Sequence, residues 1–415
     1  MKDLFANPKI KELSKYVKKQ NKRQKAYEMV EGQAELTPIQ KWYFANNKEE
    51  LDHFNQSFML FRKDGFAENC VRMAFNKILE HHDALRMIYE EKNGTVIQYN
   101  RDYQENLFDL NVYDVRGLGH KSEKMHELAT RIQKKSSIEK GKLVNLAIFQ
   151  TDEGDHLLIV IHHLVVDGVS WRILFEDFDI LYSQALKGET LEVGYKTDSY
   201  QDFARRLKAY AGSRQLLNEA EYWRNIAKAE VPFMPQNQTL KRDIFANSTT
   251  LSATLDKETT ASLLRKTNRA YNTEINDILL TGLIAGIRDI TGENKLKVMM
   301  EGHGREDILE GADISRTVGW FTTMYPVLLD LGDEKGISQH IKMVKETLRK
   351  IPNKGIGYGI LKYLAEDPDF MHEEKAKISF NYLGEIDADI NRGEFSGSNF
   401  SEGESIGGKI SRPFN

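Results

Sequence analysis

The stretch His-His-Leu-Val-Val-Asp-Gly-Val-Ser-Trp, residues 162–171, sets the local architecture in this chain of 415 residues. It follows the five apolar residues Leu157 to Ile161, a run that is too short for a membrane span and is typical of a buried strand. After it, apolar side chains at positions 171, 174, 175 and 178 fall on one face of a helix. The stretch therefore joins a central strand to a helix, and ligands of α/β proteins commonly bind at such strand ends.

The adjacent residues His162 and His163 are candidates for acid–base chemistry. If the strand continues through both, their imidazoles point to opposite faces, so that one can meet a substrate while the other is held inside the protein. An imidazole titrates near neutral pH and is a natural proton acceptor. The structural alternative is one core histidine with a satisfied N–H and one ring exposed to solvent. The pair alone leaves both interpretations open.

The composition is that of a globular protein, and a length of 415 residues predicts two domains or two large lobes. A net charge of −4 and a pI of about 6.3 give no indication of nucleic acid or of an anionic membrane as a partner. The single cysteine, Cys70, cannot form an intrachain disulfide, which fits a reducing compartment. The sequence has no apolar signal core and no run of about 20 apolar residues, so we expect a cytoplasmic protein.

Hydrophobic patterns divide the chain into four parts and predict an α/β fold. Residues 1–25 are basic with helical spacing, which predicts a short amphipathic helix and a linker. Residues 26–190 and 241–415 alternate strand and helix patterns and form two lobes, joined by a polar helical connection at 191–240. The predicted strands are 56–62, 94–99, 143–150, 157–161, 248–255, 296–301 and 321–330, and the predicted helices are 67–82, 121–135, 171–186, 198–211, 215–229 and 276–290, the last closed by Gly292.

A second polar cluster, Glu-Gly-His-Gly-Arg-Glu at 301–306, ends the predicted strand 296–301. Because the apolar residues 296, 298 and 300 share one face, Glu301 leaves from the other face at the last strand position. A carboxylate in the second lobe and a histidine in the first could face each other across a cleft. One base on each side of a carbon would suit removal of a proton from one face and its return to the other. The alternative is a charged loop with an internal Glu–Arg pair.

Other chemistries fit the sequence less well. His162, His163, Asp167, Glu301 and His303 offer donors for zinc, but adjacent histidines diverge on a strand and no paired ligand spacing occurs, so we expect no metal site. The glycines at 355, 357 and 359 indicate a turn before a helix, because they lack the phosphate-loop and dinucleotide patterns. Ser170 is interpreted as a helix cap, not as a nucleophile, since no nucleophile-elbow motif is present.

Seven motifs occur in order along the chain, at residues 36–42, 162–171, 276–280, 301–306, 316–326, 352–359 and 380–384. Together they resemble the condensation/epimerization superfamily of nonribosomal peptide synthetases. The His-His-x-x-x-Asp-Gly element is shared with condensation domains, whereas the Ser-Trp ending at 170–171, the string at 301–306 and Gly-Trp-Phe-Thr at 319–322 are similar to epimerization domains. The resemblance implies two chloramphenicol-acetyltransferase-like lobes in a V-shaped pseudo-dimer with a central tunnel.

The resemblance also implies the chemistry. The phosphopantetheine arm of an upstream carrier (thiolation) domain would bring an aminoacyl or peptidyl thioester into the tunnel, with no cofactor bound directly and a condensation domain downstream. His163 and Glu301 would flank the α-carbon, and two-base proton transfer would relax the thioester toward an L/D mixture. Asn381 and Tyr382 would lie near the enolate oxygen or the proton path, since the enolate needs electrostatic stabilisation.

For the remaining residues the resemblance implies supporting roles. His162 would support His163 from inside the lobe. Asp167 would be structural and paired with Arg86, because a buried carboxylate needs a partner. Residues 1–25 would be the last helix and linker of the carrier domain, and the second lobe would be incomplete at Asn415. The alternatives are a condensation domain, in which His163 assists an amine that attacks a thioester, and a non-catalytic carrier-binding module.

Overall fold

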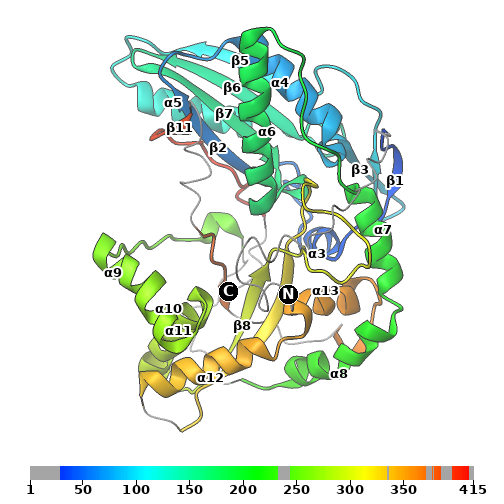
Figure 1. Ribbon diagram of the computed structural model, residues 1–415, viewed down its shortest axis with the longest axis vertical. Helices are drawn as coiled ribbons and strands as arrows, with labels where there is room; N and C mark the ends of the chain where they lie inside the picture. Colours follow the sequence, from blue (N-terminus) through cyan, green and yellow to red (C-terminus); the bar gives the residue numbers. More distant parts are fainter. Residues whose placement is uncertain are drawn as a thin grey trace, which may run out of the picture.

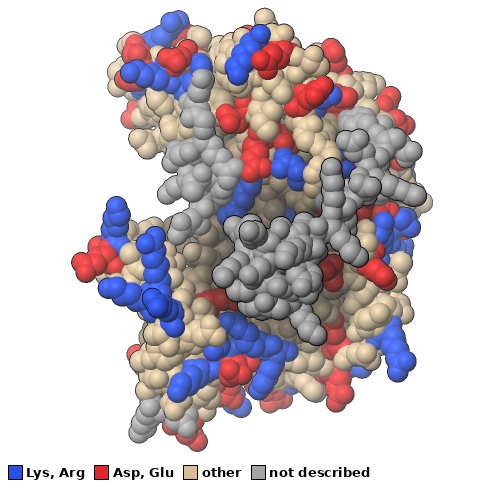
Figure 2. Space-filling model, in the orientation of Figure 1, with Lys and Arg blue, Asp and Glu red and all other residues tan. Residues whose placement is uncertain are grey.

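The computed structural model describes residues 29–231, 244–333, 336–370, 376, 378–384 and 395–410. These residues form two α/β lobes that diverge on one side, like the arms of a V (Figure 1). On the other side α3 (Pro38–Asn46) and α7 (Tyr200–Tyr210) lie where the lobes meet. The space-filling view also shows a notch between the lobes. Lys and Arg side chains gather at its edge, over α9 (Lys257–Ala261) and α10 (Asn268–Tyr271) (Figure 2).

The first lobe is built on a five-stranded sheet of order β11-β2-β7-β6-β5. β5 is parallel to β6, and the other neighbours are antiparallel. Helices α4 and α6 cover one face and α5 the other (Figure 1). The bounds are β2 (Asn55–Arg62), β5 (Asp109–Asp114), β6 (Val144–Thr151), β7 (Gly154–His162), β11 (Ser396–Gly397), α4 (Glu68–His81), α5 (Lys121–Gln133) and α6 (Gly168–Lys187).

Burial on both faces explains the uninterrupted apolar run in β7. Leu157, Ile159 and Ile161 pack with α4 and α6 in the larger core, whereas Leu158 and Val160 pack with α5 in a second cluster. A smaller antiparallel sheet of order β1-β4-β3 completes the lobe. Its strands are β1 (Gly32–Ala34), β4 (Thr95–Asn100) and β3 (Met87–Lys92), and the 3-10 turns nearby are η1 (Asp83–Arg86) and η2 (His163–Val165).

The second lobe contains a three-stranded sheet of order β10-β8-β9, in which β10 is parallel and β9 antiparallel to β8. The strands are β8 (Lys295–Gly302), β9 (Thr323–Asp330) and β10 (Ile378–Phe380). The helices are α8 (Arg214–Lys228), α11 (Ile275–Thr291), α12 (Ile337–Arg349) and α13 (Ile356–Tyr363), with α9 and α10 joined by the π-helical turn Ser262–Thr267. Short 3-10 turns are η3 (Phe245–Asn247), η5 (Pro352–Gly355) and η6 (Pro368–Phe370). None of the helices in the described ranges has the length and apolar content that a membrane crossing needs.

Most predicted elements are confirmed within a few residues, and Gly292 closes α11 with a φ of 79° as expected. The predicted strand at 248–255 is wrong. Its residues form neither helix nor strand, no described strand pairs with them, and Leu251 is 93% exposed. Ser170 is not the cap of α6, because Asp167 holds that position and accepts from the Ser170 N–H at 2.8 Å. Residues 1–25 lie outside the described part of the chain.

Most of residues 395–410 lie on the first lobe, although the sequence pattern assigned them to the second. The last of them, Gly408 and Ile410, accept from the N–H groups of Ala246 and Phe245 in η3. β11 pairs with β2, and Phe54 forms an isolated bridge with Ile406. The Phe395 ring stacks on Phe66 with centroids 5.6 Å apart. We call residues 395–410 the return segment. It gives the first sheet an edge strand from the far end of the chain, which local hydrophobic patterns cannot reveal.

Candidate active site

His163 stands at the end of β7, as the first residue of η2. Its ring is half-buried between Phe54, stacked at 5.0 Å, and Trp320, with centroids 4.6 Å apart. Its Nδ1 lies 2.8 Å from the Val166 carbonyl oxygen. Burial lowers the pKa of the imidazole, so the ring is neutral at pH 7 and can accept a proton.

His162 points into the first lobe and is fully buried. Its Nε2 donates to the Leu51 carbonyl oxygen at 2.8 Å, and its Nδ1 accepts from the Leu164 N–H at 3.2 Å. Burial lowers its pKa to about 3. The structure therefore places one histidine inside and leaves the other partly accessible, the divergence expected of neighbouring strand residues.

Asp167 joins the first lobe to the second. It caps α6, and its other carboxylate oxygen accepts from the Phe321 N–H at 2.9 Å. Its charge partner is Arg305, with an N–O distance of 3.4 Å, and the Arg305 guanidinium lies 3.8 Å from the centre of the Phe321 ring. This aspartate thus fixes both the loop after His163 and the segment that leads into β9.

The predicted pair of Asp167 with Arg86 is wrong. Arg86 is fully buried in η1 and donates to the carbonyl oxygens of Leu79 and Glu80 in the last turn of α4. A cationic side chain is favourable at that position because it meets carbonyls that have no partner within the helix. Arg86 therefore stabilises a helix end in the first lobe.

Glu301 lies at the end of β8 and is half-buried. The Asn381 side-chain amide donates to its Oε2 at 2.7 Å, and burial raises the pKa of the Glu301 carboxyl to about 7. Tyr382 follows with 38% of its surface exposed. The alternative of an internal Glu–Arg pair does not hold, because Arg305 turns to the first lobe and Glu306 meets His303 instead.

The segment before β9 connects the two candidate bases. Glu301 is the register partner of Met324 in β9, and Trp320, four residues earlier, packs on His163. Close backbone approach explains the glycine at 304, since a Cβ there would lie 1.6 Å from the Phe321 carbonyl oxygen. The motifs at 162–171, 301–306 and 316–326, which are far apart in sequence, therefore meet where the lobes join.

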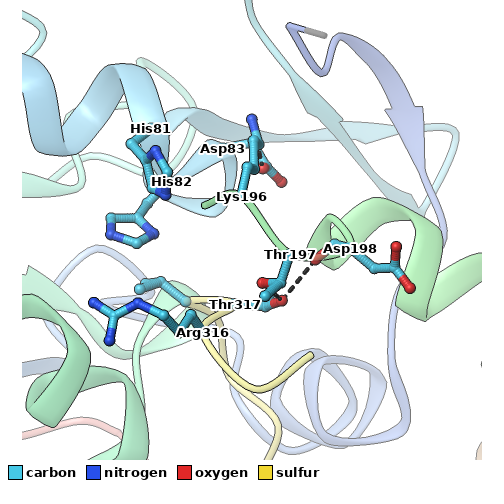
Figure 3. A pocket seen from close by; sticks show the side chains of 9 residues that line it. His81, His82, Asp83, Lys196, Thr197, Asp198, Arg316 and Thr317 are labelled. Atoms are coloured by element: carbon cyan, nitrogen blue, oxygen red, sulfur yellow. Dashed lines mark hydrogen bonds and ion pairs between the residues drawn. The ribbon is translucent and has the colours of Figure 1, made fainter. Parts of the chain in front are cut away.

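A separate group of charged side chains also joins the lobes (Figure 3). His82 Nε2 lies 2.8 Å from the Asp177 carboxylate, which also bonds to Arg316 from the second lobe. The cavity here is lined by His81, His82, Asp83, Lys196, Thr197, Asp198, Arg316, Thr317 and Val318. The pairing of Asp177 with both lobes stabilises the junction. In the part of the chain that the structure describes, no group of three His, Cys, Asp or Glu side chains is arranged to hold a metal ion.

The model of the condensation domain matches residues 30–410. The chain belongs to the condensation-domain family. The chain is 79% identical over 412 residues to bacitracin synthase 3 of Bacillus licheniformis, an alignment that covers 99% of this chain and 6% of that protein. It is 44% identical over 415 residues to gramicidin S synthase 1 of Brevibacillus brevis, with 98% of this chain and 37% of that protein covered. The chain therefore spans a small part of the synthases that it matches.

Solved structures of the condensation-domain family separate into near and distant relatives. The epimerization domain from the third module of tyrocidine synthetase B is 43% identical, with a TM-score of 0.86 over 93% of this chain and 87% of that chain. The condensation domain of the Monacolin K polyketide synthase MokA is 15% identical, with a TM-score of 0.73 over 93% of this chain and 88% of that chain. The second likeness shows the mixed α/β fold of the family alone.

Three further residues of this condensation-family site, Gln56, Trp320 and Arg305, were not singled out from the sequence. Trp320 and Arg305 lie inside motifs identified in the sequence, but the motifs did not predict that Trp320 packs on His163 or that Arg305 pairs with Asp167. Gln56 begins a predicted strand and lies outside every motif, and its side chain meets His163 only through the pairing of β2 with β7. No local signal could have identified it.

The raised pKa of Glu301 predicts a pH-dependent effect on stability. The folded state holds the carboxyl proton up to about pH 7, against a usual value of 4.5, so folding stability falls as pH rises between these values, by at most about 3 kcal/mol. Glu301→Gln cannot ionise and avoids this loss. We expect the variant to be more stable than the parent at pH 8 and equal to it at pH 4, measured by urea unfolding. A stability difference of the same size at both pH values would contradict the assignment.

Proposed function

We propose that this condensation-family domain epimerizes the α-carbon of an aminoacyl or peptidyl thioester in nonribosomal peptide synthesis. The observation that carries the proposal is the placement of two ionisable groups at strand ends on opposite lobes, His163 packed on Trp320 and Glu301 paired in register with Met324 four residues further on. His163 is neutral at pH 7, whereas Glu301 retains its proton up to about pH 7. One base and one acid, poised at the same pH, are what exchange of a proton between two faces of a carbon needs. The 43% identity to an epimerization domain supports the same conclusion.

In this mechanism His163 removes the α-proton and Glu301 returns a proton from the opposite face. The reverse direction exchanges the two roles. The enolate that forms between these steps needs hydrogen-bond donors near its oxygen. Asn381 holds Glu301 at 2.7 Å and, with the exposed Tyr382, is our candidate for the enolate oxygen or the proton path.

The substrate in this proposal arrives on the phosphopantetheine arm of an upstream carrier domain. No cofactor bound by the domain itself is required, because the thioester already acidifies the α-proton. A condensation domain downstream would accept the product. The similarity to three bacitracin synthases supports this setting, which we place in the cytoplasm.

The second candidate is peptide-bond formation, which the match to the condensation-domain model favours. His163 would then assist an amine that attacks the thioester carbonyl. A carboxylic acid on the other lobe has no part in that reaction. Glu301 is therefore the residue that separates the two functions.

The deciding experiment measures solvent deuterium at the α-carbon of an aminoacyl thioester loaded on a separate carrier domain in D₂O. Epimerization predicts deuterium in the inverted product without an acceptor thioester. Condensation predicts no exchange, and peptide formation once an acceptor-loaded carrier is added. A folded sample with neither activity would support the non-catalytic module.

The protonation states also predict the pH dependence of inversion. Conversion that begins at His163 requires neutral imidazole and a protonated Glu301. Since the pKa of Glu301 is about 7, the initial rate of inversion should fall above pH 7, by about tenfold per pH unit. The rate of appearance of the inverted isomer across neutral pH measures this. A rate that still rises above pH 8 would exclude Glu301 as the proton donor.

A further inference from the structure

Two side chains outside the proposed acid–base pair are joined to His163 in a continuous chain of hydrogen bonds. The indole Nε1 of Trp171 lies 2.8 Å from Gln56 Oε1, and Gln56 Nε2 lies 3.1 Å from His163 Nε2. On the other side of the ring, Nδ1 lies 2.8 Å from the Val166 carbonyl oxygen. Gln56 enters this chain from β2, where its register partner in β7 is Ile161, two residues before His163.

The chemistry of these groups allows only one arrangement of protons. An indole N–H can only donate, so it meets the oxygen of the Gln56 carboxamide and leaves the NH₂ group facing His163. A carbonyl oxygen can only accept, so the Val166 contact requires a proton on His163 Nδ1. His163 Nε2 is then the atom without a proton, and it accepts from the Gln56 amide.

The indole is itself held in place. The Trp171 ring packs edge-on against Phe58, with centroids 4.7 Å apart, and at a tilt of 32° against Phe175, with centroids 5.5 Å apart. Trp171 is buried, whereas Gln56 and His163 are half-buried. Trp171 is thus the buried, fixed end of this chain of hydrogen bonds, and the His163 imidazole is its accessible end.

We propose that Gln56, oriented by Trp171, is a positioning residue that keeps His163 in the Nδ1–H tautomer with the lone pair on Nε2. The proposal rests on the proposed function, since it assigns Nε2 as the atom that removes the α-proton. In this proposal the substrate α-proton replaces the Gln56 amide at that lone pair, because the two donors cannot use it together. It also opposes protonation of Nε2, because two N–H donors would then face each other.

The tautomer can be measured without substrate. Long-range ¹H–¹⁵N spectra of the ¹⁵N-histidine protein report which ring nitrogen carries the proton, and the His163→Gln spectrum identifies the signal among 11 histidines. We expect a protonated Nδ1 and a bare Nε2. In Trp171→Phe, which keeps a ring and removes one N–H, the signal should shift toward a mixture of tautomers. A parent protein with the proton on Nε2, or an unchanged signal in Trp171→Phe, would overturn the proposal.

Gln56→Glu tests the same contact by activity. Glutamate keeps the length and the acceptor for Trp171, but places an acceptor in front of His163 Nε2 in place of a donor. The rising limb of the rate–pH profile, which reports loss of the proton from His163, should move up by at least about one pH unit, so that inversion falls about tenfold at each pH on that acid limb, while the falling limb set by Glu301 stays near pH 7.

Gln56→Met is the matched control, since it keeps the volume and removes both polar atoms. A merely structural role predicts the same loss for both variants and no movement of the profile, and that result would overturn the proposal. Circular dichroism checks that each variant is folded. If the parent exchanges no α-proton, the proposed function fails, while the tautomer spectra still decide the role of Gln56.

Discussion

Replacing His163 with alanine should reduce α-proton exchange by about 10²–10⁴-fold, the usual contribution of a general base. The ring lies between Phe54 and Trp320, and the other ring of the pair is fixed inside the lobe by Leu51. His162 therefore cannot replace the lost base. Initial rates of solvent deuterium uptake into the thioester, for the parent and for His163→Ala, measure the effect.

The control for this experiment has to separate loss of the base from loss of packing. His163→Gln keeps most of the side-chain volume and should lose as much activity as His163→Ala. His126→Gln changes an exposed histidine that bonds to Ser401 and should keep the parent rate. Activity within a few-fold of the parent in folded His163→Gln would show that another group removes the proton.

Replacing Asp167 with alanine should destabilise the protein by about 3–5 kcal/mol, because it leaves the charge of Arg305, whose side chain is only 9% exposed, without its partner. The same change removes the cap of α6 and the acceptor for the Phe321 N–H. These losses fall on the two segments that bring His163 and Trp320 together, the start of α6 and the residues before β9. Chemical unfolding of parent and variant measures the difference in unfolding free energy.

A double-mutant comparison makes this prediction specific. Arg305→Met in the Asp167→Ala background removes the uncompensated charge, so the double variant should be less unstable than the sum of the single changes. Asp114→Ala, which breaks an exposed ion pair with Arg116, should change the unfolding free energy far less than Asp167→Ala. Folded Asp167→Ala with the stability and exchange rate of the parent would contradict the structural role of Asp167.

Local patterns were sufficient for the elements that bury an apolar face. The run 157–161 reads as a strand because α4, α6 and α5 cover both faces of β7, so every side chain is apolar. The same holds for α11, where the helical period and Gly292 mark both the face and the end. His163 and Glu301 could be chosen from sequence because each ends such a strand.

Contacts between distant segments could not be predicted in this way. A buried carboxylate such as Asp167 needs a cationic partner, but the sequence alone does not distinguish Arg86 from Arg305 as that partner. Which arginine contacts Asp167 depends on how the two lobes pack against each other. Likewise, an alternating pattern at 248–255 predicts a strand, yet a strand also needs a neighbour to pair with, and no described strand supplies one.

The return segment has a consequence for the order in which the molecule is made. His53 meets the Glu404 carbonyl oxygen from 351 residues away in sequence, and β11 closes the edge of β2 from the same remote stretch. During synthesis the first lobe therefore emerges with β2 as an open edge, a surface prone to mispairing with other strands. Because domains fold largely in order of emergence, the first lobe reaches its final sheet only after the second lobe has left the ribosome.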